Sequence, residues 1–220
     1  MRLATGFVLA ALCGILAAIS LEDVSLPGAS SAQADSAARL QPKVVLLPGD
    51  LVFRRGLTMA SRVVRAADAD SLFSHVGIVD VQGKSPRVIH SAPAGEGSAA
   101  GGVISEPLSQ FLSAGNATMA GIYRLKNEES AIPVRALDLA REYLYRAAPF
   151  DGSFDLADQE AVYCTEFIWA VYAGAGVDLS AGRFDRLEVP FKTDVDFILP
   201  STLTKSADLE SIEILTFEEW

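Results

Sequence analysis

Apolar positions that alternate or cluster between residues 44 and 125 predict a set of short strands. These strands are expected at residues 44–53, 75–81, 87–90, 103–105 and 119–125. The first follows the turn Pro48-Gly49-Asp50 and is predicted to be an edge strand. Residues 82–86 separate the second and third strands with glycine, serine and proline, so these two strands should form a hairpin.

Four further segments are predicted to be helical, at residues 57–67, 107–113, 133–145 and 163–173. Pro133 suits the first position of its helix, and glycines at 174 and 176 should end the last one. Apolar residues along the last helix follow the spacing of a buried stripe that begins at Cys164. Residues 92–102 are rich in glycine and alanine and predict a loop, whose part 94–102 could act as a lid. Strands and helices together indicate an α+β fold with an antiparallel sheet packed against helices.

The N-terminal segment has the layout of a secretory signal. Arg2 precedes an uncharged apolar run at residues 7–19, and Ala32-Gln33-Ala34 is a small-residue cleavage site. We therefore expect a signal peptide at 1–34, a linker at 35–43 and one domain at 44–220. This organisation predicts an exported, periplasmic protein. An uncleaved membrane anchor is the alternative, and membrane association is expected only in that case.

The charge of the chain excludes one class of partner. The 220 residues carry a net charge of −10, and removal of 1–34 leaves 17 basic and 26 acidic residues, a balance of −9. No run of lysine and arginine is present to neutralise phosphates, so nucleic acid is not expected as a partner. About 186 residues suffice for one domain with a full core.

Cysteine and histidine usage points to a nucleophilic site. Cleavage would leave Cys164 without an intramolecular partner, and His75 and His90 are the only histidines in the chain. An exported protein has little structural reason to keep an unpaired thiol unless the thiol is deeply buried or used. A thiol attacks as thiolate, and both a helix N-terminus and an imidazolium would lower its pKa. The first turn of the last helix could also hold an oxyanion, with a weaker role possible for Tyr163.

The two histidines fall on the two strands of the predicted hairpin. His75 begins one strand and His90 ends the next, so their rings could touch. One imidazole could then transfer the proton while the other fixes its orientation. These residues could also form a three-ligand zinc set, but the tight ligand pairs of such sites are missing, and neither a metal nor another cofactor is expected.

Three motifs resemble a known superfamily: Asp50-Leu51-Val52-Phe53, the segment from Ser74 to Val79, and the segment from Val88 to Pro93. They resemble the NlpC-type cell-wall peptidases, which are papain-like cysteine enzymes. In those enzymes the cysteine helix precedes the sheet, whereas Tyr163-Cys164-Thr165-Glu166-Phe167 follows it here. This order resembles the circularly permuted, YiiX-like amidases and the lecithin:retinol acyltransferase relatives.

The resemblance implies a role for each candidate residue. It makes Cys164 the nucleophile, His75 the general base and acid, and His90 the residue that orients His75. YiiX-like members often have glutamate at the third position, so His90 departs from that pattern. The implied activity is cleavage of an amide, in cell-wall peptide or a related envelope conjugate, through an acyl-thioester. Two alternatives stay open: a lipid or ester acyl hydrolase or acyltransferase, and a non-catalytic envelope binding module.

Overall fold

In a computed structural model of the chain, the structure describes residues 39–81, 83, 85–126, 131–154, 156–157, 160–189 and 192–217. The predicted signal peptide and Cys13 lie outside these residues. Ala37–Trp220 form one compact unit. Leu40 is already buried within it, and its N–H donates to the carbonyl of Leu112 at 2.9 Å. Packing therefore begins inside the segment 35–43 that was expected to be a linker.

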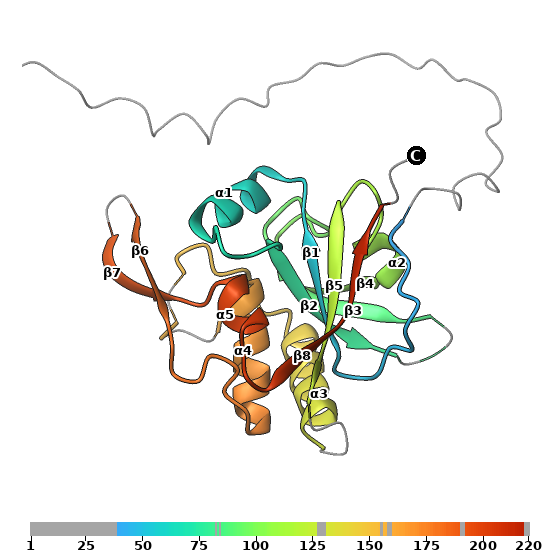
Figure 1. The fold of residues 1–220 in the computed structure, drawn as a ribbon. Coiled ribbons are helices and arrows are strands. Elements are labelled where there is room, and N and C mark those ends of the chain that lie inside the picture. Colours follow the sequence, from blue (N-terminus) through green and yellow to red (C-terminus); the bar gives the residue numbers. More distant parts are fainter. Residues whose placement is uncertain are drawn as a thin grey trace, which may run out of the picture. The chain divides into compact units, whose positions relative to one another are not determined.

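The described residues form strands and helices in mixed order along the chain (Figure 1). In chain order the elements are β1 Leu51–Arg55, α1 Met59–Ala67, β2 His75–Asp80, β3 Arg87–Ala92, β4 Gly102–Pro107, α2 Leu108–Phe111, β5 Met119–Leu125, α3 Ile132–Tyr145, α4 Cys164–Ala175, β6 Asp185–Val189, β7 Lys192–Phe197, α5 Pro200–Thr204 and β8 Leu209–Thr216. Six strands make one sheet in the order β4-β3-β2-β1-β5-β8, and β6 pairs with β7. All of these pairings are antiparallel.

The predicted hairpin and the predicted helices are present, but the prediction of an edge strand is wrong. β1 lies inside the sheet, with β2 on one side and β5 on the other. Its core residues Leu51, Val52 and Phe53 are fully buried. The chain returns to the free side of β1 only after residue 118, so no local pattern around the first turn reveals this pairing.

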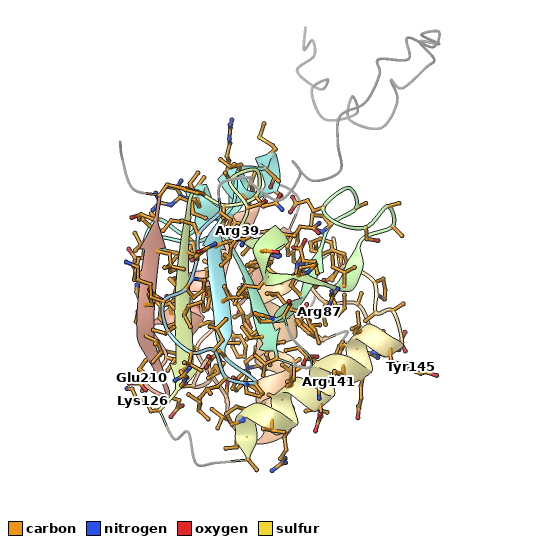
Figure 2. All side chains as sticks on the ribbon, turned by 90° about the vertical axis from the view of Figure 1, so that its right-hand side faces the viewer. Arg39, Arg87, Lys126, Arg141, Tyr145 and Glu210 are labelled. Atoms are coloured by element: carbon orange, nitrogen blue, oxygen red, sulfur yellow. The ribbon has the colours of Figure 1, made fainter. Side chains whose placement is uncertain are left out.

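Each face of the large sheet has its own apolar core. One face packs against α3 and α4 and buries Phe53, Ile78 and Ile89 with the apolar side of α4. The other face packs against α2 and buries Val52, Val79 and Val88 with Phe111. Figure 2 shows the side chains of the sheet and of α3, with Arg141 labelled on the helix. The guanidinium of Arg141 lies 2.9 Å from the carboxylate of Asp80 in β2 and so connects α3 to the sheet.

Helix ends follow the signals expected of them. α4 begins at Cys164 and ends at Ala175, and the next residue, Gly176, has a φ of 111°, a left-handed conformation that suits glycine. Gly174, which was also expected to end the helix, lies inside it. α5 starts at Pro200, a residue that suits the first position of a helix. Within the described ranges, no helix has the length and apolar character required to cross a bilayer.

Candidate active site

Cys164 is the first residue of α4, and the residues around it fix that position. Tyr163 precedes the helix in an extended conformation, and its N–H donates to the carboxylate of Glu166 at 3.1 Å. The hydroxyl of Thr165 donates to the carbonyl of Ile198, which ties the first turn to the chain after β7. The thiol therefore occupies a helix N-terminus, as the sequence predicts.

The electrostatic surroundings of the thiol differ from the expectation. Burial raises the pKa of Cys164 to about 11, although backbone N–H groups of Thr165 and Val76 and the charge of Arg54 act in the opposite direction. The helix N-terminus and a nearby cation are thus present, but the loss of hydration outweighs them. In this state Cys164 is a neutral thiol at pH 7.

The histidine pair is joined by a direct hydrogen bond. Nε2 of His75 lies 2.8 Å from Nδ1 of His90, and the two ring planes stand at 88°. Both rings are buried and both contact the ring of Phe111 from α2. Burial lowers the pKa of His75 well below its ordinary value, and the charges of Arg54 and His90 act in the same direction. Both histidines are consequently neutral at pH 7, since burial also lowers the pKa of His90.

The structure adds two charged residues that the sequence analysis missed. Oε1 of Glu106 lies 3.1 Å from Nε2 of His90, an ion-pair distance at which the hydrogen-bond geometry is not ideal. Arg54 lies 3.6 Å from Glu106 and 3.9 Å from Glu96, with its guanidinium over the ring of Phe111. A buried chain of polar side chains therefore runs from His75 through His90 and Glu106 to Arg54.

The register of the sheet explains why these side chains meet. Arg54 is directly paired with His75, so both project from the same face. His90 is paired with Ile104, which places Glu106 two residues along β4 on that face. The signal in the sequence is a glutamate just beyond the predicted strand 103–105. It becomes informative only when the pairing of β3 with β4 is known.

A glycine makes room for the histidine pair. Gly77 lies between His75 and the apolar end of β2, and a Cβ there would meet Val88 at 2.3 Å and the Cβ of His90 at 3.0 Å. Such distances are too short for an unshifted side chain. The close packing of the two strands at the site thus depends on this residue.

The thiol and the histidines approach from different faces of the sheet. α4 covers one face, whereas His75 and His90 pack with Phe111 on the other. They come together at the start of β2, where His75 and Cys164 line one cavity of about 720 Å³. Within the described part of the chain, no hydrogen bond joins the sulfur to His75, so proton transfer requires these two side chains to approach one another.

The cavity walls are mainly apolar. Helix α1, the segment around Phe150 and the chain after β7 supply most of the lining, through Met59, Ala60, Val63, Val64, Ala67, Phe150, Phe154, Phe197, Ile198, Leu199 and Pro200. Met59 and Val63 are 71% and 63% exposed, which leaves apolar surface open at this cavity. Pro93 and Glu96 of the glycine-rich loop also line it, so the loop lies beside the site as expected.

Tyr163 lines the same cavity, but its polar groups already have partners. Its hydroxyl accepts a hydrogen bond from the N–H of Ile198 at 2.9 Å, and its own N–H is used by Glu166. The backbone N–H is therefore unavailable to an oxyanion, while the hydroxyl proton can still be donated. Among the described residues, no group of three or more His, Cys, Asp or Glu side chains is arranged to hold a metal ion.

Comparisons with known proteins agree with this architecture. The family model for permuted papain-like amidase enzymes, the YaeF/YiiX or C92 family, matches residues 45–212. Among solved structures, YiiX from Escherichia coli O157:H7, described as a metalloprotein, is similar with a TM-score of 0.60 and 21% identity over 79% of this chain and 97% of that chain. The search of curated proteins gave no match. The expected fold class is confirmed, and the chain belongs to the permuted papain-like amidase family of YaeF and YiiX.

Proposed function

We propose that this chain is a cysteine amidase in which Cys164 is the nucleophile, His75 the general base and acid, and His90 the residue that orients His75. The family is one of amidases, and its chemistry needs a nucleophile with a proton acceptor in reach. The observation that carries the proposal is the common cavity: the free thiol at the start of α4 and the ring of His75, which is hydrogen-bonded to His90 behind it, line the same space.

The neutral state of the site defines how acylation starts. Nε2 of His75 is engaged by His90, so Nδ1 is the ring nitrogen left for the thiol. Nδ1 takes the S–H proton as the sulfur bonds to the substrate carbonyl carbon, so no stable thiolate is required beforehand. The carbonyl oxygen becomes an oxyanion, which backbone N–H groups in the first turn of α4 can receive.

Collapse of that intermediate breaks the C–N bond. The proton held on Nδ1 of His75 passes to the departing amine, and the acyl group remains on Cys164 as a thioester. Water then gives a proton to Nδ1 while its oxygen attacks the thioester carbon. When the C–S bond breaks, the sulfur recovers the proton and the carboxylic acid leaves.

The cavity supports an apolar acyl group more than a charged peptide. Glu96 is the one Asp, Glu, Lys or Arg side chain among the described residues that line it, and aliphatic and aromatic side chains dominate the rest. This lining favours the second candidate function, hydrolysis or transfer of an acyl group held in an ester or lipid, which the same thioester chemistry can perform. The expected substrates are therefore acyl amides first and acyl esters second, in the cell envelope if the N-terminal segment directs export.

Two matched substrate series test these assignments. N-acyl-4-nitroanilides and 4-nitrophenyl esters, from acetyl to dodecanoyl, are compared with cell-wall peptide fragments. We expect hydrolysis that disappears in Cys164→Ala and His75→Ala, with kcat/KM rising roughly three- to fourfold per methylene until the cavity is filled. Turnover of esters but not anilides would favour the second candidate. Binding of peptide fragments without turnover of any substrate would favour the binding module.

The opening of the cavity allows a finer test of the acyl group's position. Val63 is exposed on α1, so Val63→Glu should change stability little while placing a charge beside the bound chain. The variant should raise KM for the dodecanoyl substrate and leave that for the acetyl substrate nearly unchanged. An equal effect on both substrates would show that the acyl chain does not lie along α1.

A further inference from the structure

We infer that Glu106 is a positioning residue that fixes the tautomers of both histidines and thereby creates the free base at Nδ1 of His75. The inference rests on the proposed function for its catalytic consequence. Its structural part concerns only where the two imidazole protons reside.

The argument starts at the buried end of the polar chain. A carboxylate can only accept hydrogen bonds, so Glu106 at 3.1 Å favours a proton on Nε2 of His90. Arg54, which can only donate, lies 3.6 Å from the same oxygen, Oε1, so this oxygen must act as an acceptor. A neutral imidazole carries one proton, and Nδ1 of His90 is then an acceptor.

The second ring follows from the first. Nδ1 of His90 lies 2.8 Å from Nε2 of His75, and one of these two nitrogens must donate. With Nδ1 of His90 as acceptor, the proton must be on Nε2 of His75. The lone pair of His75 is consequently on Nδ1, the nitrogen that the proposed mechanism needs to accept the thiol proton.

The opposite tautomers would inactivate the site although every residue is still present. If His90 carried its proton on Nδ1, it would donate to Nε2 of His75, whose own proton would then be on Nδ1. No lone pair would remain for Cys164. Burial makes the choice decisive, because the rings are 6% and 1% exposed and water has little access to satisfy the alternative.

Glu106→Leu is the informative substitution, because it removes the acceptor that His90 and Arg54 share and leaves only the donor Arg54. Without the carboxylate, the charge of Arg54 favours a lone pair on Nε2 of His90 and the proton on its Nδ1. We expect both histidines to switch tautomer and kcat to fall roughly 10²- to 10⁴-fold, the range of a general-base contribution. Glu106→Gln, in contrast, can keep an oxygen at the position that Arg54 and His90 both face, and should retain the wild-type tautomers. Glu106→Asp, which keeps the carboxylate, should retain the wild-type tautomers and recover part of kcat. Glu210→Gln, on an exposed position of β8, is the control and should match wild type (Figure 2).

Nitrogen-15 NMR of histidine-labelled, tag-free protein reads the tautomers directly, since the chain has only two histidines. Wild-type protein should show both rings protonated at Nε2 near pH 7.5, and Glu106→Leu should show both protonated at Nδ1. Unchanged tautomers in that variant, or a switch that leaves kcat within about threefold, would overturn the inference. Activity that persists in Cys164→Ala would instead overturn the proposed function, while the NMR result would stand by itself.

Discussion

His75 and His90 are joined by a buried hydrogen bond: Nε2 of the first ring lies 2.8 Å from Nδ1 of the second. This contact leaves a single nitrogen of His75 to face the cavity that Cys164 also lines. The geometry is that of a base whose orientation is set by a neighbouring ring. Because both rings are buried, their protonation is controlled by the charges packed around them, and this control can be tested.

The acid limb of the pH profile should lie below the ordinary histidine range. Burial and the charge of Arg54 lower the pKa of His75, so the ring stays neutral and active until the pH falls well below 6.5. Arg54→Met removes a positive charge that opposes protonation, raises this pKa and should move the limb to higher pH. Arg54→Lys keeps the charge and should leave the limb near its wild-type position. Measurement of kcat/KM across the pH range checks this, and a limb that does not move in Arg54→Met would contradict it.

Stability should also depend on these rings. The unfolded chain binds protons on histidine near pH 6.5, whereas the folded chain binds them only at lower pH because burial lowers both pKa values. The contribution of the histidines to the free energy of unfolding should therefore be greatest above about pH 6.5. It should fall as the pH drops below that value, by at most about 1.4 kcal/mol per histidine for each pH unit. Urea unfolding at about pH 7.5 and about pH 5.5 measures the effect. The double variant His75→Gln, His90→Gln should show a weaker dependence of the free energy of unfolding on pH. An unchanged dependence would show that other groups cause it.

Gly77→Ala should damage both stability and activity. The added methyl group would meet Val88 and His90, so the strands must shift and the histidine contact loosen. We expect a loss of about 1–3 kcal/mol, the usual cost of overpacking, together with a fall in kcat. Gly115→Ala is the matched control, because no atom of a neighbouring group lies within 4 Å of the place that its methyl group would take, and the change should be nearly neutral. Equal stability of the two variants in denaturant unfolding would refute the packing argument.

Tyr163→Phe separates a structural role from a catalytic one. The hydroxyl accepts from the buried N–H of Ile198, which would lose its partner at a cost of about 1–3 kcal/mol. If support of the chain after β7 is the main task of Tyr163, kcat at saturating substrate should stay within about threefold of wild type. A large fall in kcat with unchanged stability would make the hydroxyl proton part of oxyanion binding.

Local patterns were sufficient for the hairpin and the cysteine helix. The turn at 82–86 and the β-rich segments around it place His75 and His90 on paired strands, and the apolar stripe starting at Cys164 predicts α4. Both features depend on neighbours in sequence, which the chain itself displays.

Features that depend on distant pairing were missed. Glu106 reaches His90 only through the register of β3 with β4, across the glycine-rich loop. β1 is an internal strand because β5 pairs with it, and β8 pairs with the other side of β5 to form the edge of the sheet. The raised pKa of Cys164 was also not predictable, because motif position gives the favourable contributions and only the packed structure gives the burial that outweighs them.

Rapid-quench mass spectrometry tests the central claim, that Cys164 carries the acyl group during turnover. Wild-type protein mixed with a 4-nitrophenyl acyl ester and quenched in acid should gain the mass of the acyl group on the peptide that contains Cys164. Cys164→Ala should gain nothing and release no 4-nitrophenol above background, and His75→Ala should acylate far more slowly. Full turnover by Cys164→Ala, or an acyl group found on another residue of the active wild-type protein, would contradict the account.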